Sequence, residues 1–169
     1  MTALSILDIK EFMNLLLRTD TFDSFLMLEG SITTYMAYLL DGHAISDFFS
    51  PEDESYDVVS QEKYIPFSLV RPICFDIMKG KRTPSSFKFV FQLSSANQER
   101  TIASVHSNFS PADISGMYLN LKYQNQSLTC TTGVSYRIFS MDKSLEYAWD
   151  DMVKRFFKKC QIAFELLVS

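Results

Sequence analysis

The stretch SLEYAWDDMVKRFFKKCQIAFELL, residues 144–167, contains the clearest periodicity in the chain. Its apolar residues follow one another at spacings of 4, 3, 4, 4, 3 and 4, which is the pattern of one continuous face of an α-helix. We therefore predict a long C-terminal amphipathic helix over 144–167 that starts at Asp142 or Ser144 and covers apolar surface, with its first four stripe residues buried. The stripe consists of Leu145, Trp149, Met152, Phe156, Cys160, Ala163 and Leu167.

Three stretches before this helix read as strands. SFKFVFQLS, residues 86–94, alternates apolar and polar side chains, as a strand with one buried face does. Residues 25–49 are rich in β-branched and aromatic side chains, and Asp41–Gly42 predicts a hairpin turn within them. Residues 117–140 predict a three-stranded meander with turns at Asn125 and Gly133.

Three further helices are predicted between the strands. The first covers residues 8–18, the second follows a short apolar stretch within residues 65–80, and the third covers residues 94–105. In the second of them Pro72 is expected in the first turn and Gly80 at the C-terminal cap, where proline and glycine are tolerated best.

Together these elements predict an α+β fold, a mainly antiparallel sheet with packed helices. The 169 residues, 47% of them hydrophobic, fit one domain spanning 1–169. Shifted by 63 positions, residues 3–28 lie over residues 66–91, which indicates a weak internal repeat of residues 2–49 and 65–140. In both halves the predicted order is strand, helix, strands. The C-terminal helix is an addition to this repeat.

Charge and the N-terminal residues limit the classes of function. The formal net charge of −4 does not give the field of a general nucleic-acid binder, so phosphate affinity would need a local patch. The opening MTALSILDIKEFMNLLL lacks a basic start and carries Asp8, Lys10 and Glu11 within its apolar run. This argues against a signal peptide and a membrane span, and we expect a cytoplasmic protein with no membrane partner.

One local basic patch is KGKRT, where Lys79, Lys81 and Arg82 are candidates for a phosphate or nucleic-acid contact. The stretch does not match the phosphate-loop motif, and it runs from a helix into a strand rather than the reverse. Cations at a helix C-terminus also neutralise the partial negative charge of its free carbonyls, with Gly80 in a left-handed cap. Capping is the favoured interpretation, and the anion site remains the alternative.

A second basic cluster lies in the C-terminal helix. Asp150 and Asp151 stand four positions before two of its cations, which is the favourable order for ion pairs on a helix surface. A solvated helix face is therefore favoured over a secondary nucleic-acid contact. The cluster consists of Lys154, Arg155, Lys158 and Lys159.

No catalytic, metal or cofactor motif is present, so the sequence predicts no catalytic residue, no metal site and no cofactor. His43 and His106 stand outside any recognisable pattern. The three cysteines, Cys74, Cys130 and Cys160, are far apart and read as packed, reduced thiols rather than nucleophiles or a disulfide framework.

Two stretches carry a resemblance to a known family. VRPICFDIMKGKRTPSSFKFVFQLS, residues 70–94, and LTCTTGVSYRIFSMDKSLEYAWDDMVKRFFKKCQIAFE, residues 128–165, resemble an uncharacterised family of single-domain proteins from clostridial gut bacteria, which has no assigned activity. The resemblance implies a bacterial, cytoplasmic origin and supplies no catalytic residue.

The organisation strand, helix, strands, occurring twice, is also similar to that of a sliding-clamp domain. In clamps the paired helices face DNA with basic side chains, whereas the first helix here offers Lys10 and Arg18 against Asp8 and Glu11. Likeness of architecture alone does not establish function.

Two hypotheses of function follow. The first is a non-enzymatic binding or scaffold domain, in one version clamp-like, that recognises a protein segment or DNA. The second is a small enzyme or ligand-binding protein whose site gathers distant polar residues, for example His43, His106 or Cys130 with carboxylates. The first is preferred, and the oligomeric state stays open.

Overall fold

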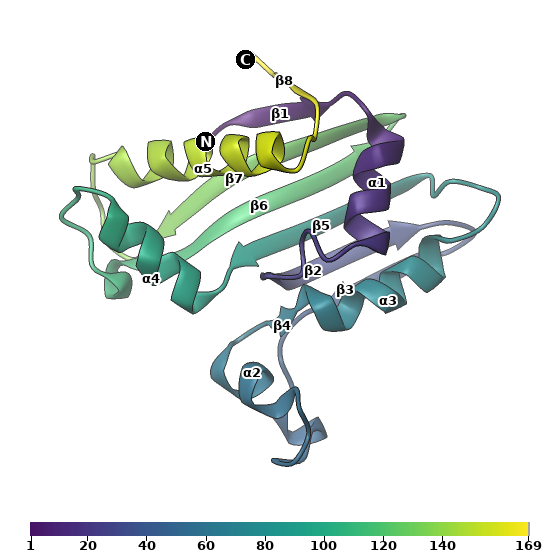
Figure 1. Cartoon of the computed structure of the whole chain (residues 1–169), viewed down its shortest axis with the longest axis horizontal. Helices are drawn as coiled ribbons and strands as arrows, with labels where there is room; N and C mark the ends of the chain where they lie inside the picture. Colours follow the sequence, from purple (N-terminus) through teal and green to yellow (C-terminus); the bar gives the residue numbers. More distant parts are fainter. Residues whose placement is uncertain (169) are drawn as a thin grey trace.

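The computed structural model describes residues 1–168 and has an α+β fold built on one antiparallel sheet, as predicted (Figure 1). The strand order is β3-β2-β5-β6-β7-β1-β8, and β4 pairs with β2 beyond the end of β3. The strands are β1 (Ala3–Ile6), β2 (Phe25–Thr33), β3 (Ala37–Asp41), β4 (Ile65–Pro66), β5 (Ser86–Leu93), β6 (Ile114–Gln124), β7 (Ser127–Tyr136) and β8 (Phe164–Leu166). The α-helices are α1 (Ile9–Arg18), α2 (Tyr56–Gln61), α3 (Phe67–Met78), α4 (Ser95–Ser104) and α5 (Ser144–Lys159), and 3₁₀ turns span Ser46–Phe48 and Pro111–Asp113.

The sheet buries one face and leaves the other open. In β5 the alternation predicted from the sequence places Phe87, Phe89 and Phe91 on the buried face. On the opposite face Lys88 of β5 stands directly across from Lys122 of β6, and both are exposed. Because side chains alternate along a strand, one apolar face and one polar face follow from the pattern of the sequence.

Aromatic contacts place the helices on the buried face. Phe22, in the loop after α1, is fully buried, and its ring centroid lies 5.4 Å from that of Phe12 in α1. The same ring lies 5.9 Å from Phe91 of β5 and 5.5 Å from Phe156 of α5. In α3, Phe67 packs at 4.8 Å from Phe91. One aromatic cluster therefore joins three helices to the centre of the sheet.

The C-terminal helix is shorter than predicted. It ends at Lys159, and Gln161 adopts a left-handed φ of 60°. The N–H of Gln161 donates to the Lys158 carbonyl, and that of Ile162 donates to the Phe157 carbonyl, which is the Schellman pattern of helix termination. The chain then reverses, and β8 pairs with β1. The helical prediction for 160–167 is therefore wrong, because the apolar spacing of Cys160, Ala163 and Leu167 continues by coincidence into a strand.

The stripe on α5 is also centred differently from the prediction. Leu145 and Trp149 are buried as predicted, but Met152 and Phe156 are only half-buried. The interior positions of the following turns are taken by Val153 and Phe157. Met152 and Phe156 instead form the wall of a pocket described below.

Two predicted turns lie elsewhere. The hairpin between β2 and β3 turns at residues 34–36, whereas Gly42 follows the end of β3 and donates its N–H to the Leu28 carbonyl at 2.8 Å. A Cβ on Gly42 would collide with the carbonyl oxygen of Met27, so this glycine serves close backbone approach. Gly133 lies within β7, so the predicted three-stranded meander is a two-stranded hairpin.

The remaining local predictions are confirmed in part. The β6–β7 hairpin turns at Asn125 and Gln126, with φ of 53° and 60°, as the twist of a two-residue hairpin requires. Gly80 has a positive φ of 135°, but the C-cap of α3 is Lys79 in an extended conformation, so the predicted left-handed cap at Gly80 is wrong. Pro72, however, lies inside α3 and not in its first turn.

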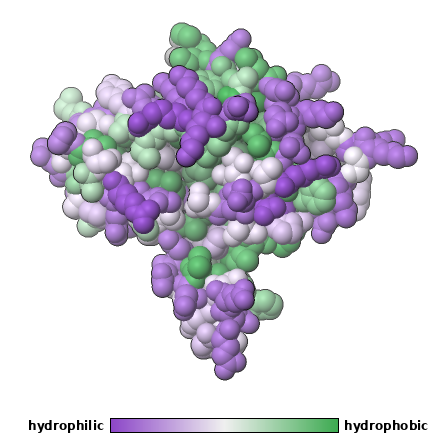
Figure 2. Space-filling model, viewed as in Figure 1, coloured by the Kyte–Doolittle hydropathy of each residue, from purple (hydrophilic) through white to green (hydrophobic). Residues whose placement is uncertain are grey.

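Residues 43–64 form an arm that projects from the body beside β3 (Figure 1). Its base is closed by a bridge between His43 and Tyr64 and by the N–H of Ala44, which donates to the Lys63 carbonyl at 2.9 Å. Figure 2 shows the arm as predominantly hydrophilic. The arm thus lies outside the aromatic core.

Strand, helix and strands follow one another in both halves of the chain, and α1 packs beside α3. Whether residues 2–49 and 65–140 form a true repeat stays a prediction.

Replacing Phe22 tests the aromatic cluster. Phe22→Ala should lower the free energy of unfolding by about 3–5 kcal/mol, because a large buried ring is lost and a cavity remains. Phe22→Leu, which removes less volume, should lower it less. Phe139, which is 93% exposed, provides the control, and Phe139→Ala should change stability by less than about 0.5 kcal/mol. Urea denaturation measures all three, and equal effects at the two positions would contradict the packing.

Candidate functional site

A mainly apolar pocket of about 330 Å³ lies between α4, α5 and the ends of β2 and β5. Its α5 wall carries the chain's single tryptophan, Trp149, with Met152 and Phe156 beside it. Half-open apolar pockets with a few polar groups are the usual binding sites of proteins. We call it the α4–α5 pocket, and its lining is Ser24, Phe25, Leu93, Asn97, Arg100, Thr101, Trp149, Met152, Val153 and Phe156.

One cation lines this pocket, and two more lie on α5 next to its wall. Arg100 of α4 is exposed at its rim and donates from Nη1 to the Asn97 side-chain oxygen at 3.2 Å. On α5, Arg155 and Lys159 are exposed and follow Met152 and Phe156 by three positions, so both border the pocket wall. Within residues 1–168 none of these three cations forms an ion pair. The rim therefore favours a negatively charged ligand.

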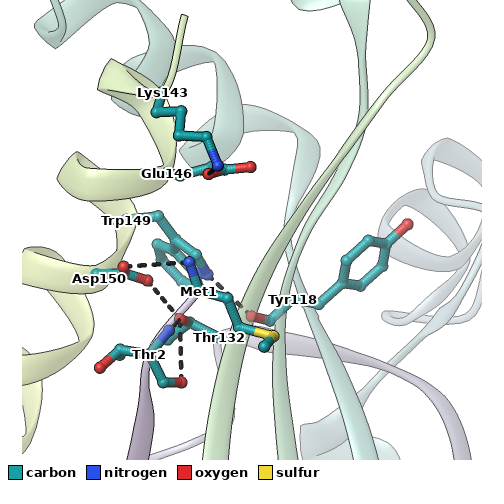
Figure 3. Close-up of polar contacts among 8 residues, drawn as sticks. All are labelled: Met1, Thr2, Tyr118, Thr132, Lys143, Glu146, Trp149 and Asp150. Atoms are coloured by element: carbon teal, nitrogen blue, oxygen red, sulfur yellow. Dashed lines mark hydrogen bonds and ion pairs between the residues drawn. The ribbon is translucent and has the colours of Figure 1, made fainter. Parts of the chain in front are cut away.

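Two separate sets of polar contacts lie behind the α5 wall of the pocket (Figure 3). The indole Nε1–H donates to the Tyr118 carbonyl at 2.9 Å, across the sheet from the Tyr118 ring. Next to it on α5, the largely buried carboxylate of Asp150 accepts a short hydrogen bond from the Thr132 hydroxyl and lies 3.5 Å from the N-terminal ammonium of Met1. The pocket wall is therefore preorganised by contacts behind it.

Further polar contacts lie along β1 and α5. The N–H of Thr2 donates to the Thr132 hydroxyl at 2.9 Å, which joins the first strand to β7. At the start of α5, Lys143 lies 3.8 Å from Glu146, and the N–H of Ser144 donates to Asp142. The hydrogen bond from the Ser144 backbone N–H holds the pKa of the Asp142 carboxyl below its usual value.

A second hollow, of about 490 Å³, lies at the edge of the sheet along β2 and β3. Its charged groups already have partners. His43 Nδ1 lies 2.6 Å from Asp41, and Lys88 lies 3.8 Å from Glu29. The backbone N–H of His43, followed by its ring, lowers the pKa of Asp41. Because its charged groups pair with one another, this hollow has fewer free charged groups to bind a ligand than the α4–α5 pocket has.

The structure does not bring the catalytic candidates together. His43 lies after β3, His106 in the loop after α4, and Cys130 on the buried face of β7. Burial raises the pKa of the Cys74 thiol to about 12, and it raises that of Cys130 further. Both thiols are therefore protonated and packed, as predicted. Among residues 1–168, no three His, Cys, Asp or Glu side chains are grouped to hold a metal ion.

The first basic cluster lies at the end of α3. The ammonium of Lys79 is 3.1 Å from Asp76, and Lys81 and Arg82 are exposed in the loop that leads to β5. A phosphate or nucleic-acid contact at these residues stays a prediction.

The second basic cluster lies on α5, well separated from that loop (Figure 1). Arg155 donates to the Asp151 carbonyl at 3.4 Å, and Asp150 faces Thr132. In the part of the chain that the structure covers, the expected ion pairs of Asp150 with Lys154 and Asp151 with Arg155 do not form. Lys158 and Lys159 are exposed in the last turn of α5.

The α4 side of the pocket was not predicted from the sequence. Asn97, Arg100 and Thr101 sit on a helix of weak apolar periodicity, and Ser24 lies in a loop. The half-burial of Met152 and Phe156 could not be predicted, because apolar residues on a helix have the same spacing whether they line a pocket or pack in the core.

The chain belongs to a family of unknown function, DUF5721, whose family model matches residues 15–165. The predicted resemblance to an uncharacterised family is thereby confirmed, while the clostridial origin stays a prediction. No curated protein and no solved structure matches the chain. None of the helices in residues 1–168 has the length and apolar character that a membrane span requires.

Thiol labelling tests the burial of the cysteines. At pH 8 a thiol reagent should modify Cys160, which is half-buried, and should spare Cys74 and Cys130, because the reactive species is the thiolate.

Since the folded state keeps the buried thiols protonated, their contribution to stability is full below about pH 8.5 and falls as pH rises through the raised pKa values.

The Cys160→Ser variant is the control, and it should show no rapid labelling until denaturant exposes the other two thiols. Rapid labelling of two or more native thiols would contradict the structure.

Proposed function

We propose that this domain is a non-enzymatic binding domain that holds an acidic protein segment, with one apolar side chain of the segment inserted in the α4–α5 pocket. The observation that carries the proposal is an aromatic, half-open pocket whose bordering cations have no ion-pair partner among the described residues. Apolar burial would supply affinity, and the cations would select the charge of the segment. The proposal takes the protein to be bacterial and cytoplasmic, as the sequence predicts.

The size and lining of the pocket favour a protein segment. A volume of about 330 Å³ is at the lower end for small-molecule sites, which enclose most of their ligand. An open pocket of this size suits one or two anchoring side chains. Among the described residues, Arg100 is the one ionisable group that lines the pocket, and no His, Asp, Glu, Lys or Cys side chain lines it. A binding role therefore has more support here than acid–base catalysis, and a small ligand or enzyme substrate remains the alternative.

The DNA-binding, clamp-like version has less support. α1 packs beside α3, as paired helices would, but α1 exposes both Lys10 and Glu11. A surface that contacts DNA needs several cations that neutralise phosphates. The clamp likeness, and DNA as a partner, therefore remain hypotheses beside the protein segment.

A charge-matched pair of peptides tests the proposal. The fluorescence of Trp149 should change when acetyl-Glu-Phe-Glu-amide is added, and acetyl-Lys-Phe-Lys-amide should bind more weakly, because the two peptides share an anchor and differ in charge. Arg100→Gln should weaken binding of the acidic peptide up to about fivefold, the range of an exposed ion pair. Asn97→Phe, which places a ring in the pocket, should abolish the response.

Lys158→Gln is the matched control for Arg100→Gln, because it removes an exposed cation that does not line the pocket. Equal binding of both peptides, or a full response in the Asn97→Phe variant, would refute the proposed site.

A further inference from the structure

The arm concentrates the negative charge of the chain. Residues 43–64 carry six of its 20 acidic residues and only Lys63 of its 16 Lys and Arg, so the rest of the chain, with 14 acidic residues and 15 Lys and Arg, is net positive. Glu62 is used within the fold, because it accepts hydrogen bonds from the N–H and hydroxyl of Ser95 at the start of α4. The acidic residues nearer the tip are Asp47, Glu52, Asp53, Glu54 and Asp57. Within residues 1–168 these five form no ion pair.

An aromatic side chain stands among these carboxylates. Phe48 is 84% exposed and directly follows Asp47. Its ring contacts Phe49 at 5.6 Å, edge to face, which holds it on the surface of the arm. An exposed aromatic anchor flanked by carboxylates has the chemistry that the α4–α5 pocket selects.

We infer that the arm of one copy docks in the α4–α5 pocket of a second copy, with Phe48 as the anchor and the carboxylates of the arm facing Arg100, Arg155 and Lys159. The inference rests on the proposed function and names the partner of that site. The opposite charges of the arm and the pocket border favour this occupant over an unrelated apolar segment.

The arm cannot readily reach the pocket of its own chain. Its base is closed by the Ala44–Lys63 hydrogen bond, and Glu62 ties it to α4. From this base the arm points away from the body, whereas the pocket lies between helices on the buried face of the sheet (Figure 1). Donor and acceptor surfaces are therefore different patches of one chain. Contacts of this kind join copies head to tail and produce rings or filaments.

Sedimentation equilibrium tests the inference on the full chain. The weight-average mass of the wild type should rise above 19.5 kDa as the protein concentration is raised. Because the contact buries less surface than a standard interface, concentrations up to about 1 mM are needed. Added salt should lower it, because the charges at the contact are exposed. Phe48→Ala and Asn97→Phe should each remain at 19.5 kDa. Phe139→Ala, which removes an equally exposed ring outside the arm, should assemble like the wild type.

Mixing the two variants that should not assemble alone distinguishes this contact from other modes of assembly. The Phe48→Ala variant keeps its pocket, and the Asn97→Phe variant keeps its arm, so an equimolar mixture should form a 1:1 dimer and nothing larger. Circular dichroism spectra identical to the wild type would confirm that both variants fold.

Three results would overturn the inference. If the wild type stays at 19.5 kDa at every concentration while the acidic peptide still binds, self-docking is wrong and the proposed function stands. If Phe48→Ala assembles as strongly as the wild type, the arm is not the contact. Assembly without any peptide response would refute both proposals.

Discussion

The packing of helical aromatic side chains on one face of the sheet is the interaction on which the rest of the structure depends. Phe22 and Phe91 lie at its centre, and α1, α3 and α5 each contribute a ring to the same cluster. Because side chains alternate along each strand, burying this face leaves Lys88 and Lys122 on the other. The core is therefore a single layer between the helices and the sheet, and segments that do not reach it remain at the surface.

Both candidate interaction surfaces follow from this one-sided core. α4 and α5 cover the sheet without closing on each other, and the space between them is the pocket walled by Trp149 and Phe156. Residues 43–64 contribute no large side chain to the aromatic cluster and extend as an acidic arm. The hydrogen bonds from Trp149 to the Tyr118 carbonyl and from Thr132 to Asp150 hold one wall of the pocket, whereas the opposite wall depends on α4, whose start Glu62 of the arm caps. The two surfaces are thus joined through one hydrogen-bonded side chain.

Much of the fold could be predicted because its signals are periodic. The alternation in 86–94 predicts the buried face of β5, which is confirmed. The helical spacing in 144–167 predicts a helix that is confirmed over 144–159, with Leu145 and Trp149 buried and Met152 and Phe156 only half-buried. The errors arose where spacing carries no information about tertiary contacts. The helix ends at Gln161, a residue with no intrinsic preference for a left-handed turn, and Gly42 looked like a turn although close approach of β2 requires it. The pocket could not be predicted because Arg100, Ser24 and Phe156 come together only when α4, the β2 edge and α5 pack.

The most direct test of the account is an intermolecular paramagnetic relaxation measurement. A nitroxide attached at Ser50→Cys in a Cys160→Ser background would sit on the arm, two positions after Phe48. Cys74 and Cys130 are buried and unreactive, so only the introduced cysteine is labelled. Mixed with an isotopically labelled copy that carries no nitroxide, it should broaden the indole N–H signal of Trp149, and the broadening should weaken as salt rises. An unchanged Trp149 signal at concentrations where the protein is assembled would contradict the account.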